Sequence, residues 1–210
     1  MPNLNLTWID SAPIKRLNKN QAAIAIRQLK ANMVGWGEVD VPDPAAPDDI
    51  NQRDWKEEKR TQQECWNDRI DSTNTMLDMT FDGLINFGYY IAGQPIAVLS
   101  ISEYAYIEDL VTHPGSANAG GIMIEYAVNI SEEELGEEGK LELYALDDDA
   151  QRAYQALGFE GKTSTTDKSM KFDPRNTDKW AKVGGKWCIA KYSGMKYVGG
   201  VKPLPPIPRR

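Results

Sequence analysis

Few of the residue types that usually mark a catalytic or metal centre occur in this sequence. Its 210 residues include one histidine, His113, and two cysteines, Cys65 and Cys188. Two cysteines are too few for a disulfide framework, and these two lack the spacing of metal ligands. We therefore expect no metal site, no thiol nucleophile at Cys65, and a reducing, cytoplasmic setting.

Long apolar runs are also missing. No run approaches the ~18 apolar residues that a membrane span needs. The first ten residues, MPNLNLTWID, lack a basic region followed by an apolar core. We expect no membrane partner, and a chain of this length needs no more than one good-sized domain.

The formal net charge of −7 hides an uneven distribution. Residues 171–210 contain ten Lys/Arg and two Asp/Glu, whereas the residues before them contain 14 and 29. An acidic body disfavours the phosphates of nucleic acids and favours cationic partners, amines among them. Solubility alone explains the same charge, and the composition does not decide between the two.

Apolar periodicity predicts a mixed α/β chain. Residues 4–10 alternate apolar and polar side chains like a strand, and residues 20–33 carry a helical apolar stripe. Residues 84–112 are rich in strand formers, and the Ala-Gly-Gln break at 92–94 indicates a hairpin turn. Further strands are expected at 104–112, 140–146 and 169–173, helices at 53–70, 121–130 and 147–159, and an acidic linker at 131–140. This order predicts a sheet with helices on its faces.

A stretch of small residues joins one of these strands to the next helix. In THPGSANAGGI (112–122) nearly all side-chain bulk disappears. Small residues let a ligand approach the backbone, and the first N–H groups of the helix point to the same place, which suits a phosphate ester. Glycine-rich turns also occur with nothing bound. The stretch is neither a P-loop nor a dinucleotide fingerprint, because no Gly-Lys-Ser/Thr follows it and the Gly-x-Gly-x-x-Gly spacing is missing.

Several motifs follow one another between residues 84 and 173. They are Leu-Val-Thr-His-Pro, the small-residue loop, an amphipathic helix, Leu-Glu-Leu-Tyr-Ala-Leu, and Ala150-x-x-x-Tyr154-x-x-Leu157-Gly158-Phe159. Together they resemble the GNAT family of acyl-CoA-dependent N-acyltransferases. The resemblance implies an α/β domain over residues 1–173, with a mixed, mostly antiparallel central sheet flanked by helices, and a C-terminal extension at 174–210.

The resemblance also implies a cofactor and its contacts. Acetyl-CoA would be the co-substrate, with its pantetheine arm between the strands at 104–112 and 140–146. Two positions depart from the family pattern: Asp147 replaces an Asn, and Ala117 or Ser116, depending on the register, replaces an Arg or Gln of the loop. His113 corresponds to a plain turn residue. The implied contacts are Leu110, Val111, Thr112, Ala117, Asn118, Ala119, Gly120, Gly121, Ile122 and Asp147.

Acyl transfer to an amine needs a proton acceptor for the amine and a proton donor for the thiolate. Tyr154 corresponds to the family's usual acid, and a phenol with a pKa of ~10 stays protonated at neutral pH; otherwise it is a core aromatic. Side chains alternate along a strand, so Glu108 shares a face with residues 106, 110 and 112 whereas Asp109 points away. We select Glu108 as the base and Glu103 as the second choice. A solvent-facing carboxylate and a water chain are the alternatives.

Two segments outside the motif region also bear on the function, namely residues 14–80 and the residues beyond 173. The resemblance places the acceptor-binding elements at residues 14–80, where Trp36, Trp55 and Trp66 shape a pocket or belong to the core. Beyond residue 173, Lys alternates with Trp and Tyr, a composition that can contact RNA. We favour a β-hairpin that covers a sheet edge, with Trp180 and Trp187 as its core. The final PPIPRR fits the P-x-x-P-x-R pattern of SH3-type ligands by a match that often arises by chance.

Three functions stand beside one another at this point. The favoured one is an N-acetyltransferase that transfers an acetyl group from acetyl-CoA to a primary amine of a small molecule or a protein. The second is a toxin or effector that acetylates aminoacyl-tRNA or a host protein. The third is a catalytically inactive binding module with the same fold, which the missing Arg or Gln of the loop would explain. A nucleic-acid partner is not favoured.

Overall fold

The computed structural model describes residues 14–33, 70–77, 83–113, 119–161 and 167–190. The predicted strand at 4–10 and most of the predicted helix at 53–70 lie outside these ranges. The strands are β1 (Ile14–Leu17), β2 (Ile85–Ile91), β3 (Gln94–Ile101), β4 (Tyr106–Thr112), β5 (Leu141–Tyr144), β6 (Glu160–Gly161), β7 (Ser169–Phe172), β8 (Trp180–Val183) and β9 (Lys186–Ile189).

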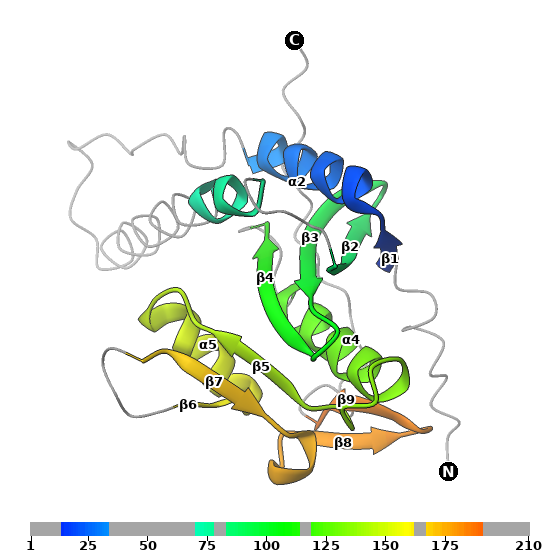
Figure 1. Cartoon of the computed structure of the whole chain (residues 1–210), viewed down its shortest axis with the longest axis vertical. Helices are drawn as coiled ribbons and strands as arrows, with labels where there is room; N and C mark the ends of the chain where they lie inside the picture. Colours follow the sequence, from blue (N-terminus) through cyan, green and yellow to red (C-terminus); the bar gives the residue numbers. More distant parts are fainter. Residues whose placement is uncertain (1–13, 34–69, 78–82, 114–118, 162–166, 191–210) are drawn as a thin grey trace, which may run out of the picture.

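Seven of these strands form one sheet, in the order β1-β2-β3-β4-β5-β7-β6 (Figure 1). All neighbouring pairs are antiparallel except β4 and β5, which are parallel. β2 and β3 are joined at Ala92 and Gly93, whose positive φ angles of 49° and 80° form the tight turn expected at this break. The mixed, mostly antiparallel sheet flanked by helices is therefore confirmed.

Three labelled helices accompany the sheet: α2 (Lys19–Met33), α4 (Ala119–Glu133) and α5 (Asp148–Leu157). Residues 70–77 are also helical. The helix expected at 121–130 begins earlier and ends later, so Ser131–Glu133 are not part of a linker. Ser131 is fully buried, and its hydroxyl donates to Lys140 O at 2.6 Å, which satisfies it there. No helix within the described ranges is long and apolar enough to cross a membrane.

α5 matches its expected limits because both ends are capped. The Asp147 side chain accepts a hydrogen bond from Ala150 N at 2.7 Å, and Gly158 ends the helix with a left-handed φ of 103°. The helix therefore begins at the Asp run and ends before Phe159, as the sequence predicts.

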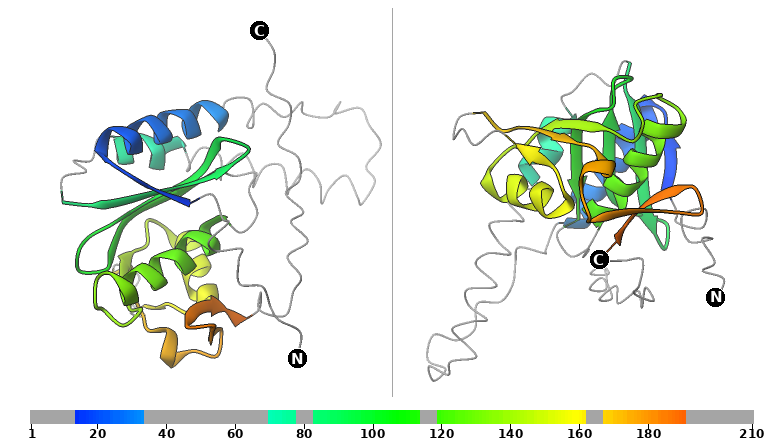
Figure 2. Two further views of the ribbon diagram at one scale, coloured as in Figure 1. Left: turned by 90° about the vertical axis from the view of Figure 1, so that its right-hand side faces the viewer. Right: turned by 90° about the horizontal axis from the view of Figure 1, so that it is seen from below.

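The two faces of the sheet are covered by different helices. Residues alternate along β3, so Val98 packs under α2 with Ile26 and Leu29, while Leu99 joins Met123 of α4 in the larger core. Figure 2 shows α2 on one side of these strands and α4 on the other. The C-terminal half of the sheet, from β5 onward, is packed on the α4 side by Leu141 and Leu143.

β8 and β9 form the predicted hairpin, with Trp180 buried and Trp187 half-buried. Its expected position over a sheet edge is wrong, because β9 lies along α4. The Asn129 side chain donates to Trp187 O and accepts from Trp187 N, both at 2.9 Å, and Glu125 accepts from Ile189 N at 2.9 Å. These side chains satisfy backbone groups of β9 that a further strand would otherwise have paired.

Candidate functional site

β4 and β5 begin side by side and then separate. Their parallel pairing is limited to Tyr106 with Glu142 and Ile107 with Leu143. β4 continues to Thr112 without pairing with β5, and Figure 1 shows the two strands diverging. The β4–β5 ladder therefore ends at Ile107, and we call the place where the two strands separate the opening; the resemblance puts the pantetheine arm there.

A β-bulge marks the start of the opening. Ser100 of β3 pairs with Asp109, but Ile101 pairs with Ile107, so Glu108 is an extra residue of β4. Beyond the bulge, His113 N donates to Ile96 O at 2.7 Å. Backbone groups alternate along a strand, so those of Leu110 and Thr112 are directed away from β3 and toward the opening. This orientation agrees with the backbone contacts implied for these two residues.

The bulge also corrects the expected directions of the side chains. Ile107 and Leu110 both belong to the core on the α4 side, although they are three positions apart. Strict alternation is therefore interrupted at Glu108, so the prediction that Glu108 shares the face of Leu110 no longer follows from it. Asp109 pairs with Ser100 and is on the α2 side, so it points away from the face of Leu110, as expected. Glu108 and Asp109 directly follow Ile107, the last residue of β4 that pairs with β5, and we call this place the mouth of the opening.

The N-terminus of α4 reaches the far end of the opening. Ala119, Gly120, Gly121 and Ile122 form its first turn, whose N–H groups have no partner within the helix. A Cβ built on Gly120 would be 3.9 Å from Thr112 Cγ2, which is ordinary contact. The structure thus brings together the implied contacts at 112 and 119–122, whereas Ala117 and Asn118 lie outside the described residues.

Tyr154 is on α5, next to the core that backs β5. Its ring is half-buried and tilted against Phe159, with 5.4 Å between the ring centroids. Ring packing of this kind also suits a core aromatic, so position alone does not assign it a role. Asp147 is engaged as the helix cap, and its carboxylate adds negative charge where an amide of the family pattern would be neutral.

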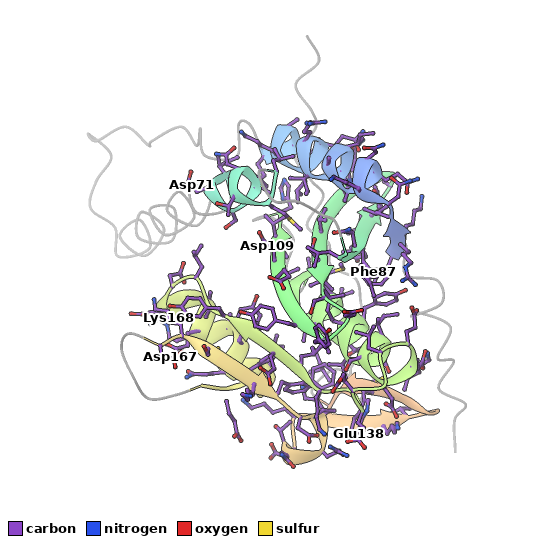
Figure 3. All side chains as sticks on the ribbon, viewed as in Figure 1. Asp71, Phe87, Asp109, Glu138, Asp167 and Lys168 are labelled. Carbon is purple, nitrogen blue, oxygen red and sulfur yellow. The ribbon has the colours of Figure 1, made fainter. Side chains whose placement is uncertain are left out.

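The carboxylates at the mouth differ in their surroundings. Glu108 is exposed, whereas Asp109 is half-buried. Burial raises the pKa of Asp109 to about 6, although a hydrogen bond from the Leu110 N–H lowers it in part. Burial also raises the pKa of Tyr106, as do the nearby charges of Glu108 and Glu142. Tyr106, Glu108 and Glu142 therefore form one acidic, aromatic surface where β4 and β5 are paired. Asp109 of β4 is labelled in Figure 3.

Other candidate residues lie away from the opening. His113 is buried, its Nε2 lies 3.3 Å from Asn32 O, and burial lowers its pKa, which agrees with a structural role. Glu103 is in the turn before β4, at the end where β4 and β5 are paired. Trp36, Trp55, Trp66 and Cys65 lie outside the described residues. Within those ranges, no three His, Cys, Asp or Glu side chains gather in a way that could hold a metal ion.

No family model matches the chain, and no curated protein sequence matches it. Several solved structures are similar. One is a GCN5-related N-acetyltransferase (aminotransferase, class-II) from Rhodopseudomonas palustris, with 16% identity and a TM-score of 0.41 over 84% of this chain and 89% of that one. Another is the PaiA N-acetyltransferase from Thermoplasma acidophilum in complex with coenzyme A, with 16% identity and a TM-score of 0.39 over 75% and 96%.

A third similar structure is the ribosomal-protein-S18-alanine N-acetyltransferase from Escherichia coli. It has 15% identity and a TM-score of 0.39 over 75% of this chain and 88% of that one. All three of these proteins are N-acetyltransferases. At such identities and TM-scores the likeness carries no argument about the reaction of this chain, which depends on the residues of its own site.

Proposed function

We propose that this chain is an N-acyltransferase that transfers an acetyl group from acetyl-CoA to a primary amine of a small molecule or a protein. The observation that carries the proposal is the opening between β4 and β5. It is bordered by the backbone of Leu110 and Thr112 and by the first turn of α4, and α5 with Tyr154 backs the neighbouring strand. The motif resemblance independently names the same residues.

The residues that border the opening suit a CoA thioester. Backbone groups of Leu110 and Thr112 would hold the pantetheine arm as an added strand would, and the amides of Ala119–Ile122 would hold the pyrophosphate at the positive end of α4. Gly120 leaves room there, because a Cβ at this position would be 3.9 Å from Thr112 Cγ2 and would meet no nearer atom of the described residues outside its own helix. When bound, acetyl-CoA supplies an acetyl group activated as a thioester.

The chain's own groups then have to move two protons. The Tyr154 phenol donates a proton to the sulfur that leaves, whose pKa near that of free cysteine, ~8.5, makes an unassisted thiolate a moderate leaving group. A carboxylate at the mouth accepts the proton that the ammonium form of the acceptor must lose, because an ammonium has no lone pair. A backbone N–H of the bulge region donates to the thioester oxygen as that oxygen gains charge.

The acceptor would approach across the acidic, aromatic surface formed by Tyr106, Glu108 and Glu142. Glu108 is exposed and forms no ion pair with a described Lys or Arg, so its charge is available to an incoming cation. Glu142 is bonded to Lys171 at 2.7 Å and contributes less. A cationic amine is therefore the acceptor class that the surface favours.

Calorimetric titration with acetyl-CoA tests the proposal, on the native chain and on Gly120→Glu and Gly120→Ala. Both variants should fold, because a Cβ at this position makes no clash with the described residues and both residue types favour a helix over glycine by ~1 kcal/mol or less. We expect micromolar binding by the native chain, similar binding by Gly120→Ala, and a loss of at least ~100-fold in Gly120→Glu, whose charge and bulk oppose the pyrophosphate.

A thiol-release assay with a panel of primary amines then identifies the acceptor. If the native chain does not bind acetyl-CoA at millimolar concentration, the proposal fails. Equal binding by the native chain and Gly120→Glu would instead show that the cofactor lies elsewhere than at α4.

A further inference from the structure

A row of polar side chains crosses the sheet at the level of the bulge. Asn86 of β2 pairs with Ser100 of β3, and Ser100 pairs with Asp109 of β4. Directly paired residues of neighbouring strands share a face, so the three side chains lie in line on the α2 side. Asn86 is 2% exposed and Ser100 is fully buried, while Asp109 is half-buried at the end of the row next to the opening.

The hydrogen bonds of this row are directed away from Asp109. The Ser100 hydroxyl donates to Asn86 Oδ1 at 2.6 Å, and Asn86 Nδ2 donates to Leu84 O at 3.3 Å. The side chain directly opposite Asp109 therefore has its proton committed to the other neighbour. Among the residues that the structure describes, no Lys or Arg forms an ion pair with Asp109.

A partly buried carboxylate without a cation or a strong donor holds a proton more readily than an exposed one. The pKa of Asp109 is accordingly about 6, with burial as the main cause and only the Leu110 N–H acting against it. None of the other titratable groups on the elements around it contributes to this shift. These groups are Tyr106, Glu108 and His113 on or after β4, Glu142 on β5, Lys30 on α2, and Asp71 in the helical segment 70–77.

We propose that Asp109, rather than Glu108, is the general base of the reaction; this rests on the function proposed above. Asp109 takes one proton from the acceptor's ammonium group, directly or through one water, and becomes a neutral carboxylic acid. The amine nitrogen then uses its lone pair to form the C–N bond while the C–S bond breaks. The sulfur receives its proton from Tyr154, and Asp109 returns its proton to solvent.

The bulge explains why the adjacent carboxylates of Glu108 and Asp109 have different roles. The backbone of Asp109 is held by its pairing with Ser100, and the next residue, Leu110, directs its backbone groups toward the opening. The affinity of the Asp109 carboxylate for a proton suits proton transfer near neutral pH. Glu108 is the unpaired, exposed residue of the bulge. It attracts the cation and influences acceptor binding more than the chemical step.

The test compares pH profiles of kcat/KM for the native chain, Asp109→Asn and Glu108→Gln, with acetyl-CoA and the best amine of the panel. Asp178→Asn, an exposed residue between α5 and β8, is the matched control. The native chain should lose activity below an apparent pKa near 6. Asp109→Asn should lack this acid limb and be slower by ~10²- to 10⁴-fold at pH 7.5. Glu108→Gln should keep the limb and mainly raise the KM of the amine.

Acetyl-CoA titration of each variant separates this inference from the proposed function. Unchanged cofactor affinity in Asp109→Asn, with the limb lost, supports the inference. Suppose that the native chain is active and that Asp109→Asn keeps the acid limb of the pH profile and a rate within a few fold of the native rate. This result overturns the inference and leaves the proposed function intact. If only Glu108→Gln loses the acid limb, Glu108 is the base. A native chain that neither binds acetyl-CoA nor turns over removes the proposed function and this inference with it.

Discussion

At the residue scale, the ionisation of Asp109 affects stability as well as chemistry. Its pKa in the folded protein, about 6, is above the ordinary value of 3.8. The folded state thus binds this proton more tightly than the unfolded state, and between about pH 4 and pH 6 the ionisation of Asp109 increasingly favours unfolding. Above pH 6 the full penalty is present.

Asp109→Asn should therefore stabilise the protein at neutral pH. An upward shift of about two pKa units corresponds to ~3 kcal/mol, so we expect the free energy of unfolding at pH 7.5 to rise by about 2–3 kcal/mol. Near pH 3.5 the difference between the variant and the native chain should vanish. Urea unfolding of both proteins at pH 7.5 and pH 3.5 measures this difference in the free energy of unfolding. An equal difference at the two pH values would contradict burial of the Asp109 charge as its cause.

Tyr154→Phe separates the chemical role of the phenol from its packing. The ring contact with Phe159 is retained, so the free energy of unfolding and the acetyl-CoA dissociation constant should change little. If the hydroxyl protonates the leaving sulfur, kcat should fall by ~10²-fold or more. Tyr126→Phe is the matched control, because Tyr126 of α4 likewise packs against a phenylalanine, edge-on to Phe87 of β2. Equal rates of the native chain and Tyr154→Phe would leave Tyr154 as a core aromatic.

At the scale of elements, α4 connects the sheet to the C-terminal hairpin. One side of the helix packs into the core through Met123, Ile124 and Ala127. The other side presents Glu125 and Asn129, one turn apart, to the backbone of β9. The same helix that offers its first turn to the opening is therefore braced near its middle by the hairpin.

Asn129→Ala should release the hairpin from α4. The substitution removes a hydrogen bond to Glu125 O and the two hydrogen bonds to Trp187, and it leaves the N–H and C=O of Trp187 without this partner, which costs ~1–3 kcal/mol for each buried group. Glu133→Ala is the control, because it breaks only the exposed ion pair with Lys186, worth ~0–1 kcal/mol. Hydrogen exchange at Trp187 and Ile189 should accelerate strongly in the first variant alone. Unchanged exchange in Asn129→Ala would mean that apolar contacts hold the hairpin.

At the scale of the whole molecule, charge separates an acidic body from a basic C-terminal part. Before residue 171 the chain has 29 acidic and 14 basic residues, whereas residues 171–210 include two acidic and ten basic residues. Ion pairs join the two parts: Lys182 contacts Glu132, and Lys186 contacts Glu133. The acidic stretch after residue 131 is thus partly neutralised, whereas Glu108 at the opening is not.

This distribution predicts a salt dependence for the acceptor. Raising the salt from ~20 to ~200 mM shortens the screening length from roughly 20 to 7 Å, so the KM of a triamine should rise several fold. The KM of a monoamine of similar length should rise much less, because a single charge gains less from the surface potential. Steady-state kinetics at both salt concentrations measures the difference, and equal ratios would exclude long-range attraction as the source of selectivity.

Local patterns of the sequence were sufficient for most elements and for the fold class. Alternation and turn residues predicted β2, β3 and the turn between them, because a positive φ at Gly93 is a local requirement. The Asp run and Gly158 predicted both ends of α5, because caps act within one turn. The order of these elements predicted a mixed α/β sheet, whereas its mostly antiparallel character was predicted only by the family resemblance.

The relations between distant segments were decided only by the tertiary structure. Strand formers lie on both sides of Glu108, so nothing local marks the bulge, which arises because Ile101 pairs with Ile107 while Ser100 pairs with Asp109. The docking of β9 on α4 depends on Asn129 and Trp187, far apart in sequence. The sequence by itself determined which residues could form strands, caps and an anion-binding turn. The pairing register decided that Asp109 lies opposite Ser100 on the α2 side, because one extra residue in a strand reverses the direction of each side chain beyond it.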